Sequence, residues 1–139
     1  MYFTKREEDQ DGLWVWISFT DHVVEGGTFD DFLRLWISYY DAQRPFTFVF
    51  ETQELTKIPS LSYALQMVLF IRALKTRPTQ YLRQSHLYVS QKSLVSLLDW
   101  IFAIQRPVAP VYIYQGGDPL RRGQESPDVI VRSDPQMKP

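Results

Sequence analysis

A chain of 139 residues is long enough for one domain with a substantial core, and a hydrophobic content of 45 % excludes a disordered polypeptide. The 15 Lys and Arg residues nearly balance the 16 Asp and Glu residues, so no overall basic field favours nucleic acid as a partner. Because cysteine is absent, the sequence excludes disulfide bonds, thiolate zinc sites and a cysteine nucleophile.

The first part of the chain predicts an arm, a strand and a helix in succession. Residues 1–12 are mostly polar and charged and predict an N-terminal arm. The segment 13–19, LWVWISF, is rich in aromatic and β-branched residues, which predicts a strand covered on both faces. Thr28 followed by Asp31 is a helix-start pattern, because both side chains can bond to free backbone N–H groups, and Pro45 ends this helix.

The following segments continue the alternation of strand and helix. Pro59 fits the first turn of a helix that Pro78 terminates. The order β-α-β-α-β-α-β predicts a single-domain α/β fold over residues 13–115, with a four-stranded, mostly parallel sheet covered by three helices. The later strands are predicted at 46–50, 85–90 and 109–115, and a helix at 91–105. The helix after Pro59 has one broad apolar stripe, formed by Leu61, Ala64, Leu65, Val68, Leu69 and Ile71.

Both ends of the chain carry apolar residues in polar surroundings. Residues 116–139 contain four of the nine prolines and three of the six glycines, which predicts an extended C-terminal tail with at most a short strand. We expect the two ends to act as arms that dock onto other proteins. The residues predicted to lie at interfaces are Tyr2, Phe3, Trp100, Val129, Ile130 and Val131.

The junction between a strand and a helix at residues 48–67 resembles a pattern of the STAS family, the sulfate-transporter and anti-sigma-factor-antagonist domains. Family members run there as apolar-Asp-Leu-Ser-Gly-apolar-x-x-Ile-Asp-Ser-Ser-Gly into a helix, and this chain runs VFETQELTKIPSLSYAL without a gap. Glu51 falls on the strand-end Asp, and Leu55 and Ile58 fall on the apolar pair. The resemblance covers residues 13–115 and implies a STAS-like fold. The lipid-binding CRAL-TRIO fold has a similar alternation of strands and helices.

The resemblance also implies a regulatory serine. Ser60 falls on the serine that a partner kinase phosphorylates in bacterial antagonists of the family. Pro59 stands where the family has Asp, and Ser62 stands where it has Gly, so the fold can be retained without the switch. The resemblance implies phosphorylation or partner contact at Ser60 and Ser62, and the alternative is that Ser60 only caps the helix.

Nothing in the sequence marks a catalytic centre. It has no Ser-His-Asp order, P-loop, dinucleotide fingerprint or paired-carboxylate arrangement, so we predict neither an enzyme nor a cofactor. His22 lies near Asp21 and Glu25, but a metal site needs three or four converging ligands, which favours a solvated loop histidine. His86 begins a strand and is expected to be packed or hydrogen-bonded.

We therefore expect a non-catalytic protein–protein interaction module, a small structural or scaffolding subunit of a larger assembly such as a virus particle or multi-subunit complex. An aromatic content of 15 % suits such a role. Two alternatives stay open, a STAS-type switch phosphorylated at Ser60 and a small-ligand or lipid-binding domain with a pocket at the C-terminal ends of the strands. Without a secretory signal or a long apolar segment, we expect an intracellular location, cytoplasmic or within a large assembly, and no membrane span.

Overall fold

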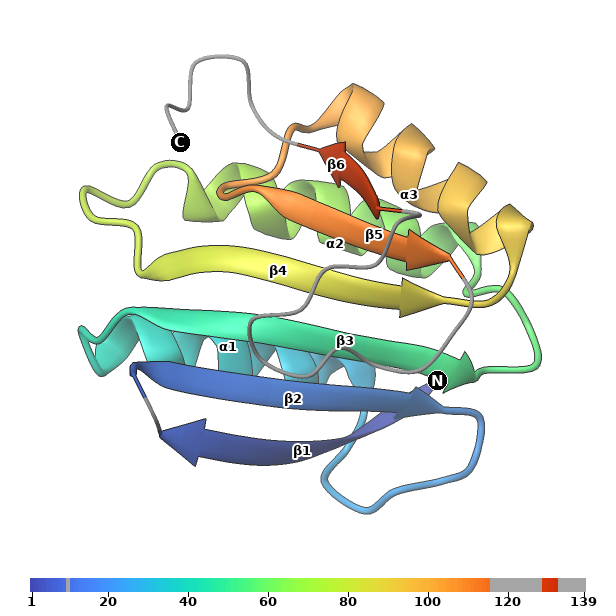
Figure 1. Cartoon of the computed structure of the whole chain (residues 1–139), viewed down its shortest axis with the longest axis horizontal. Helices are drawn as coiled ribbons and strands as arrows, with labels where there is room; N and C mark the ends of the chain where they lie inside the picture. Colours follow the sequence, from blue (N-terminus) through green and yellow to red (C-terminus); the bar gives the residue numbers. More distant parts are fainter. Residues whose placement is uncertain (10, 116–128, 133–139) are drawn as a thin grey trace.

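The computed structural model describes residues 1–9, 11–115 and 129–132. Its six-stranded sheet has the spatial order β1-β2-β3-β4-β5-β6, which equals the order along the chain (Figure 1). The strands are β1 (Tyr2–Asp9), β2 (Leu13–Thr20), β3 (Phe46–Glu54), β4 (Leu82–Val89), β5 (Val111–Gln115) and β6 (Val129–Arg132). The helices are α1 (Phe29–Asp41), α2 (Leu61–Leu74) and α3 (Lys92–Ile104).

The centre of the sheet confirms the predicted α/β architecture. Strands β2 to β5 pair parallel with one another, and a helix connects each strand to the next. Because right-handed crossovers between sequential parallel neighbours all turn the same way, they place α1, α2 and α3 on one face of the sheet. Figure 1 shows the three helices together behind the strands.

The sheet is larger than predicted, because two antiparallel strands extend it at its edges. The segment 1–12, predicted as an arm, forms β1 and pairs antiparallel with β2 from Tyr2↔Thr20 to Asp9↔Leu13. At the other edge, β6 pairs antiparallel with β5. The tail predicted over 116–139 thus contains a strand at 129–132, and its remaining residues lie outside the described part.

The arm predicted over residues 1–12 is therefore a strand, whereas the short strand allowed for in the C-terminal tail is found at 129–132. Docking of either end onto another protein stays a prediction. Phe3 is 6 % exposed and packs edge-on against Phe32 of α1, at 5.8 Å between ring centroids. Tyr2 lies half-buried in the same strand, and Val129–Val131 belong to β6. The physical reason is that backbone pairing with a neighbouring strand satisfies the hydrogen-bonding groups that a free arm would leave to water.

The sequence analysis did not predict β1 as a strand, because most of its side chains are charged. Lys5 pairs with Glu7 at 3.4 Å and Arg6 pairs with Glu8 at 2.7 Å, each two residues apart along the strand. Charged side chains are common on edge strands because they discourage pairing with another chain. The sequence did contain one signal for a hairpin, the pair Asp11-Gly12, because Asp-Gly is frequent in hairpin turns. In the structure these two residues have positive φ values of 56° and 112°.

Helix α1 starts as the sequence predicts. The side-chain oxygen of Thr28 accepts a hydrogen bond from the backbone N–H of Asp31 at 3.1 Å, and Asp31 Oδ2 accepts one from the backbone N–H of Thr28 at 3.2 Å. This reciprocal pair is the complete capping box. Asp31 therefore acts as a capping residue, and Asp30 beside it is exposed.

The main core lies between the sheet and the helices and is rich in aromatic rings. Val15 and Ile17 of β2 and Phe48 of β3 are 0 % exposed. Trp36 of α1 meets the Phe48 ring edge-on at 5.1 Å. The alternate residues of the same strands face the other side of the sheet, where no described helix lies. There a second cluster contains Val49, Tyr88 and Tyr114, with Trp14, Trp16 and Tyr112 packed against it.

Candidate functional site

Helix α2 exposes a row of leucines. Leu61, Leu65 and Leu69 are 58 %, 47 % and 61 % exposed, and their spacing of four residues aligns them on one side of the helix. They extend over about 12 Å of helix axis at 1.5 Å per residue. We call these three residues the leucine ridge. The apolar stripe predicted for this helix is thus divided, with Ala64, Val68 and Ile71 facing the core and the leucines facing outward.

Periodicity alone could not separate the two sides of α2, because this helix has apolar residues around most of its circumference. An apolar helix of that kind is normally buried on all sides. Contiguous apolar surface on a folded domain usually marks a place where another molecule binds. The leucine ridge is therefore a candidate docking surface.

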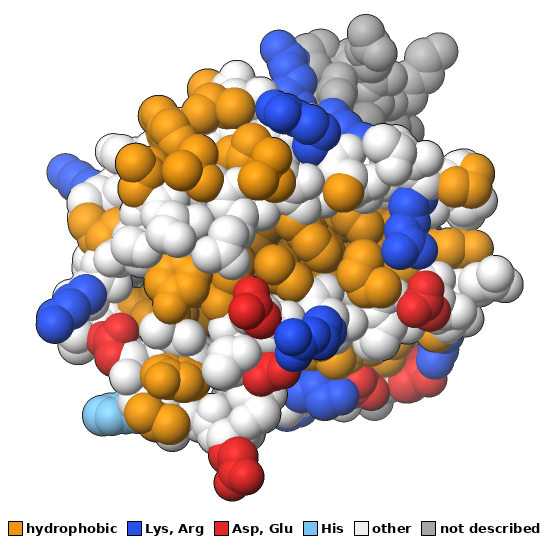
Figure 2. Space-filling view, turned by 180° about the vertical axis from the view of Figure 1, so that it is seen from behind, with side chains coloured by type: hydrophobic (Ala, Val, Ile, Leu, Met, Phe, Trp, Pro, Cys, Tyr) orange, Lys and Arg blue, Asp and Glu red, His pale blue; other side chains and the backbone are white. Residues whose placement is uncertain are grey.

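Helix α3 lies beside α2 and adds apolar surface to the same side of the molecule. Trp100 and Ile104 are 39 % and 47 % exposed, and Arg72 of α2 donates a hydrogen bond from Nε to Oε1 of Gln105 at 3.2 Å. Trp100, predicted as an interface residue, is thus placed at the surface. Figure 2, which looks onto the helical side, shows hydrophobic side chains in groups at the surface, with others recessed near the centre of the view.

Basic and acidic residues are unevenly distributed along the chain, although their total numbers are nearly equal. Residues 55–115 contain seven Lys and Arg and one acidic residue, Asp99, whereas residues 1–54 contain four Lys and Arg and 11 Asp and Glu. Several of these cations flank α2 and α3 at their ends. We call Lys57, Arg72, Lys75, Lys92 and Arg106 the basic rim. A docking surface at the leucine ridge therefore favours a partner with negative charge around an apolar centre.

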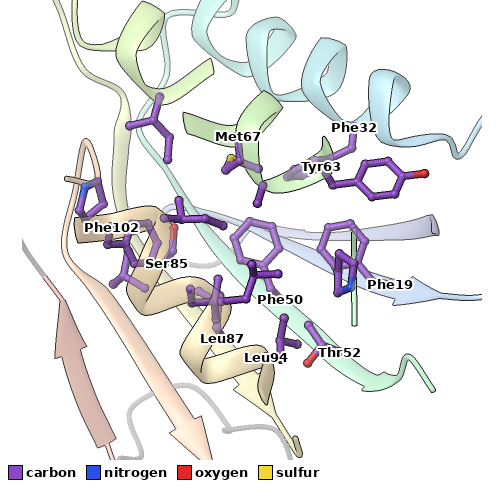
Figure 3. A pocket seen from close by; sticks show the side chains of 18 of the residues that line it. Phe19, Phe32, Phe50, Thr52, Tyr63, Met67, Ser85, Leu87, Leu94 and Phe102 are labelled. Carbon is purple, nitrogen blue, oxygen red and sulfur yellow. The ribbon is translucent and has the colours of Figure 1, made fainter. Parts of the chain in front are cut away.

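An apolar cavity lies on the inner side of α2, between the helices and the sheet (Figure 3). Its volume is ≈ 140 Å³, which is large for a protein core, where voids larger than a water molecule are few. The pocket is partly open at the surface, so it is not an enclosed void of the core. The lining includes Phe19, Thr52 and Leu55, at and just beyond the C-terminal ends of β2 and β3, so the cavity reaches the region of the alternative pocket. The ligand-binding alternative stays a prediction.

The wall of this cavity contains aromatic and aliphatic side chains and no charged one. Thr52 and Ser85 are the strand residues that bring hydroxyl groups to it, and Tyr63 of α2 points its hydroxyl away from the space (Figure 3). The Thr52 hydroxyl donates its hydrogen bond to the carbonyl oxygen of Tyr88 at 2.6 Å, so it has no hydrogen left to donate to a molecule in the cavity. The labelled residues that surround the space are Phe19, Phe32, Phe50, Met67, Leu87, Leu94 and Phe102.

The N-terminus of α2 carries the serines that the STAS resemblance singled out. Ser60 occupies the N-cap position and is exposed, but its side chain makes no capping hydrogen bond, so the expected capping role is not fulfilled. Ser62 is exposed and accepts a long hydrogen bond from Gln66 Nε2 at 3.4 Å. The loop before the helix is held by Asp21, whose Oδ2 accepts a hydrogen bond from the backbone N–H of Thr56 at 2.7 Å.

His86 lies on the face of the sheet opposite the helices. Its ring stacks between Trp14 and Tyr112, at centroid distances of 5.8 Å and 5.2 Å, and its Nδ1 is 2.8 Å from the hydroxyl of Tyr114. Burial lowers the pKa of His86 from 6.5 to about 4, because the charged ring would lose its hydration. The prediction of a packed and hydrogen-bonded histidine is confirmed, and a neutral ring at pH 7 follows.

The other candidate residues do not converge on a site. His22 is exposed, and the neighbouring Asp21 bonds to Thr56 instead of to the histidine. Among the described residues, no group of three or more His, Cys, Asp or Glu side chains is arranged to hold a metal ion. None of the helices in the described part combines the length and the apolar character that crossing a membrane requires.

The leucine ridge, the basic rim and the cavity all involve α2. The sequence placed the three leucines in one apolar stripe and left a ligand pocket as an alternative, but it did not show that the leucines are exposed or that a cavity lies beneath α2. The spacing of Leu61, Leu65 and Leu69 and the scarcity of acidic residues after residue 54 were the signals available. Comparisons with known proteins add no further guide to the role of these features. No protein-family model, curated protein or solved structure matches this chain, so its likeness to STAS domains stays a prediction.

Proposed function

We propose that this protein is a non-catalytic interaction module, a small structural or scaffolding subunit that docks onto another protein through the α2–α3 side. The observation that carries the proposal is the leucine ridge, three large apolar side chains left in water on a helix that also faces the core. Fully burying a leucine side chain contributes roughly 1.5–3 kcal/mol, and covering the exposed half of each ridge leucine contributes about half of that. A partner that covers the ridge would therefore gain enough free energy to support specific binding.

The basic rim defines the chemistry of that partner. Arg72 lies in the last turn of α2 and Lys92 begins α3, both exposed, and Arg106 follows α3. Surface charges of one sign steer a partner of the opposite sign and add little to the final affinity. We expect an apolar partner surface bordered by Asp and Glu, which binds faster at low salt than at high salt.

The proposal is tested by placing a photo-crosslinking amino acid at Leu65 and, as a matched control, at Val23 in the cell. Val23 is 79 % exposed but belongs to the loop between β2 and α1. We expect a discrete crosslinked protein from position 65 and not from position 23. The affinity of that protein for L65S and L69S should fall at least about tenfold, and V23S should bind like the original chain.

Equal affinity of the ridge variants and the original chain would refute the proposal. A chain that stays monomeric in its native extract, without a crosslinked partner at Leu65, would refute it as well. Concentration-dependent mass in sedimentation, abolished by L65S, would instead identify a second copy of the chain as the occupant of the ridge.

A second candidate function is a switch at Ser60. The favouring observation is the exposed Ser60 hydroxyl, which makes no capping bond and precedes the first leucine of the ridge. A phosphate there would gain from the free N–H groups of the helix and would add negative charge close to Lys57. It would therefore stabilise the start of α2 and weaken binding to an acidic partner.

The switch is tested with the partner that the crosslinking experiment identifies. S60D should change the affinity by at least about 1 kcal/mol, the scale of one charge-assisted contact. S38D is the control, because Ser38 is an exposed serine within α1, outside α2 and α3 and not at a helix start. Unchanged affinity of S60D would eliminate the switch and leave the docking proposal intact.

A further inference from the structure

The cavity beneath α2 has the composition of a binding site for a small apolar molecule. Its volume of ≈ 140 Å³, in a pocket that is partly open at the surface, is close to the 150 Å³ of an engineered cavity lined by Leu, Ile and Phe that binds benzene or xenon. We infer that this cavity binds one small, uncharged, apolar molecule, such as a benzene-sized ring or a short alkyl chain. This site is independent of the docking function proposed above.

The lining favours such a molecule over water. A buried water needs two to four polar partners to replace the hydrogen bonds that it loses. The hydroxyl of Thr52 already donates to the Tyr88 carbonyl, and Ser85 brings the other strand hydroxyl to the wall. The ring N–H of Trp36, which also lines the cavity, is buried without a hydrogen-bond partner and is a single donor. Because the wall offers too few hydrogen-bond partners, transfer of a water molecule into the cavity is not favoured. An apolar molecule that enters leaves its unfavourable hydration behind, so its transfer is favoured.

The orientation of α2 creates the space and keeps it from being filled by the chain. The small side chain of Ala64, which is 2 % exposed, faces the cavity, while Leu61 and Leu65 point outward. The C-terminal end of α2 is fixed, because Gln80 Nε2 donates to the carbonyl oxygen of Leu74 at 2.8 Å and Arg72 bonds to Gln105.

The walls indicate which shapes fit. Phe19 and Phe50 stack with a centroid distance of 6.0 Å and an interplanar angle of 19°, and Phe32 meets Phe50 edge-on at 5.7 Å. Phe19 and Phe50 line the cavity from the sheet, Phe32 lines it from α1, and such rings favour edge contacts with a bound aromatic molecule. Met67 on α2 is unbranched and flexible, so it can adjust to guests of different shape.

The inference is tested by titrating the purified full-length chain with benzene and, separately, with phenol. The chain carries three methionines, and ¹³C-labelled methionine methyl groups report on Met67 directly. We expect a saturable shift of the Met67 methyl signal with benzene and at least tenfold weaker binding of phenol, whose hydroxyl finds too few partners. Equal affinity for the two probes, or a shift proportional to concentration without saturation, would overturn the inference.

A pair of alanine variants locates the binding. A64L places three additional carbon atoms in the cavity, whereas A73L makes the same change at an exposed position of the same helix. The benzene shift should be lost in A64L and retained in A73L. Unchanged benzene binding by A64L would place the guest elsewhere and overturn the inference. If A64L does not fold, the benzene and phenol titrations of the original chain decide alone. The docking proposal stands in either case, because the ridge lies on the opposite side of α2.

Discussion

Acidification from pH 7 to pH 5 should weaken the fold through one residue, His86. Its pKa is about 4 in the folded chain and 6.5 when exposed. Because the folded-state pKa is lowered, the unfolded chain binds more protons between these values, and stability is lost as the pH falls through that window. At pH 5 these two pKa values give a loss of about 2 kcal/mol, an upper figure since the ring is partly exposed.

The assay is urea unfolding followed by tryptophan fluorescence at pH 7, 6 and 5, for the original chain and for H86F. Phenylalanine keeps an aromatic ring between Trp14 and Tyr112 but cannot be protonated. Burial raises the pKa of Glu51 and the Tyr39 hydrogen bond lowers that of Glu7, but neither shift is caused by His86. These contributions cancel when the two proteins are compared.

We expect the original chain to lose about 2 kcal/mol more than H86F between pH 7 and pH 5. Parallel pH dependences of the two proteins would show that His86 is not held neutral by burial. A loss only below pH 4 would point to the carboxylates instead of to the histidine.

Three other substitutions test local structure. T28A removes the complete capping box of α1 and should cost about 1 kcal/mol in urea unfolding, whereas S60A, at an N-cap without a side-chain bond, should cost much less; equal costs would contradict the difference in capping. Y39F removes the hydrogen bond from the Tyr39 hydroxyl to Glu7, which is the largest cause of the lowered pKa of Glu7. The pKa of Glu7 should then rise towards its ordinary value in a ¹³C NMR titration, and no change would show that the bond is absent in solution.

The sequence determined those elements whose signals are local. Thr28 and Asp31 marked the start of α1 because both partners of the capping box lie within one helical turn. The apolar runs of β2 to β5 and the prolines around the helices were enough to predict the parallel α/β core. Each of these signals depends on residues close to one another in the chain.

The tertiary structure decided what depends on distant neighbours. β1 is a strand because β2 offers it a hydrogen-bonding edge, although its own charged side chains do not suggest one. The apolar residues of α2 surround the helix, so only its packing against the sheet and α3 decided that Ala64 faces the core and Leu65 faces water. This orientation of α2 about its axis places the leucine ridge in water and the small Ala64 at the cavity. Periodicity in the sequence predicts which residues share a face of a helix, but it does not predict which face is buried.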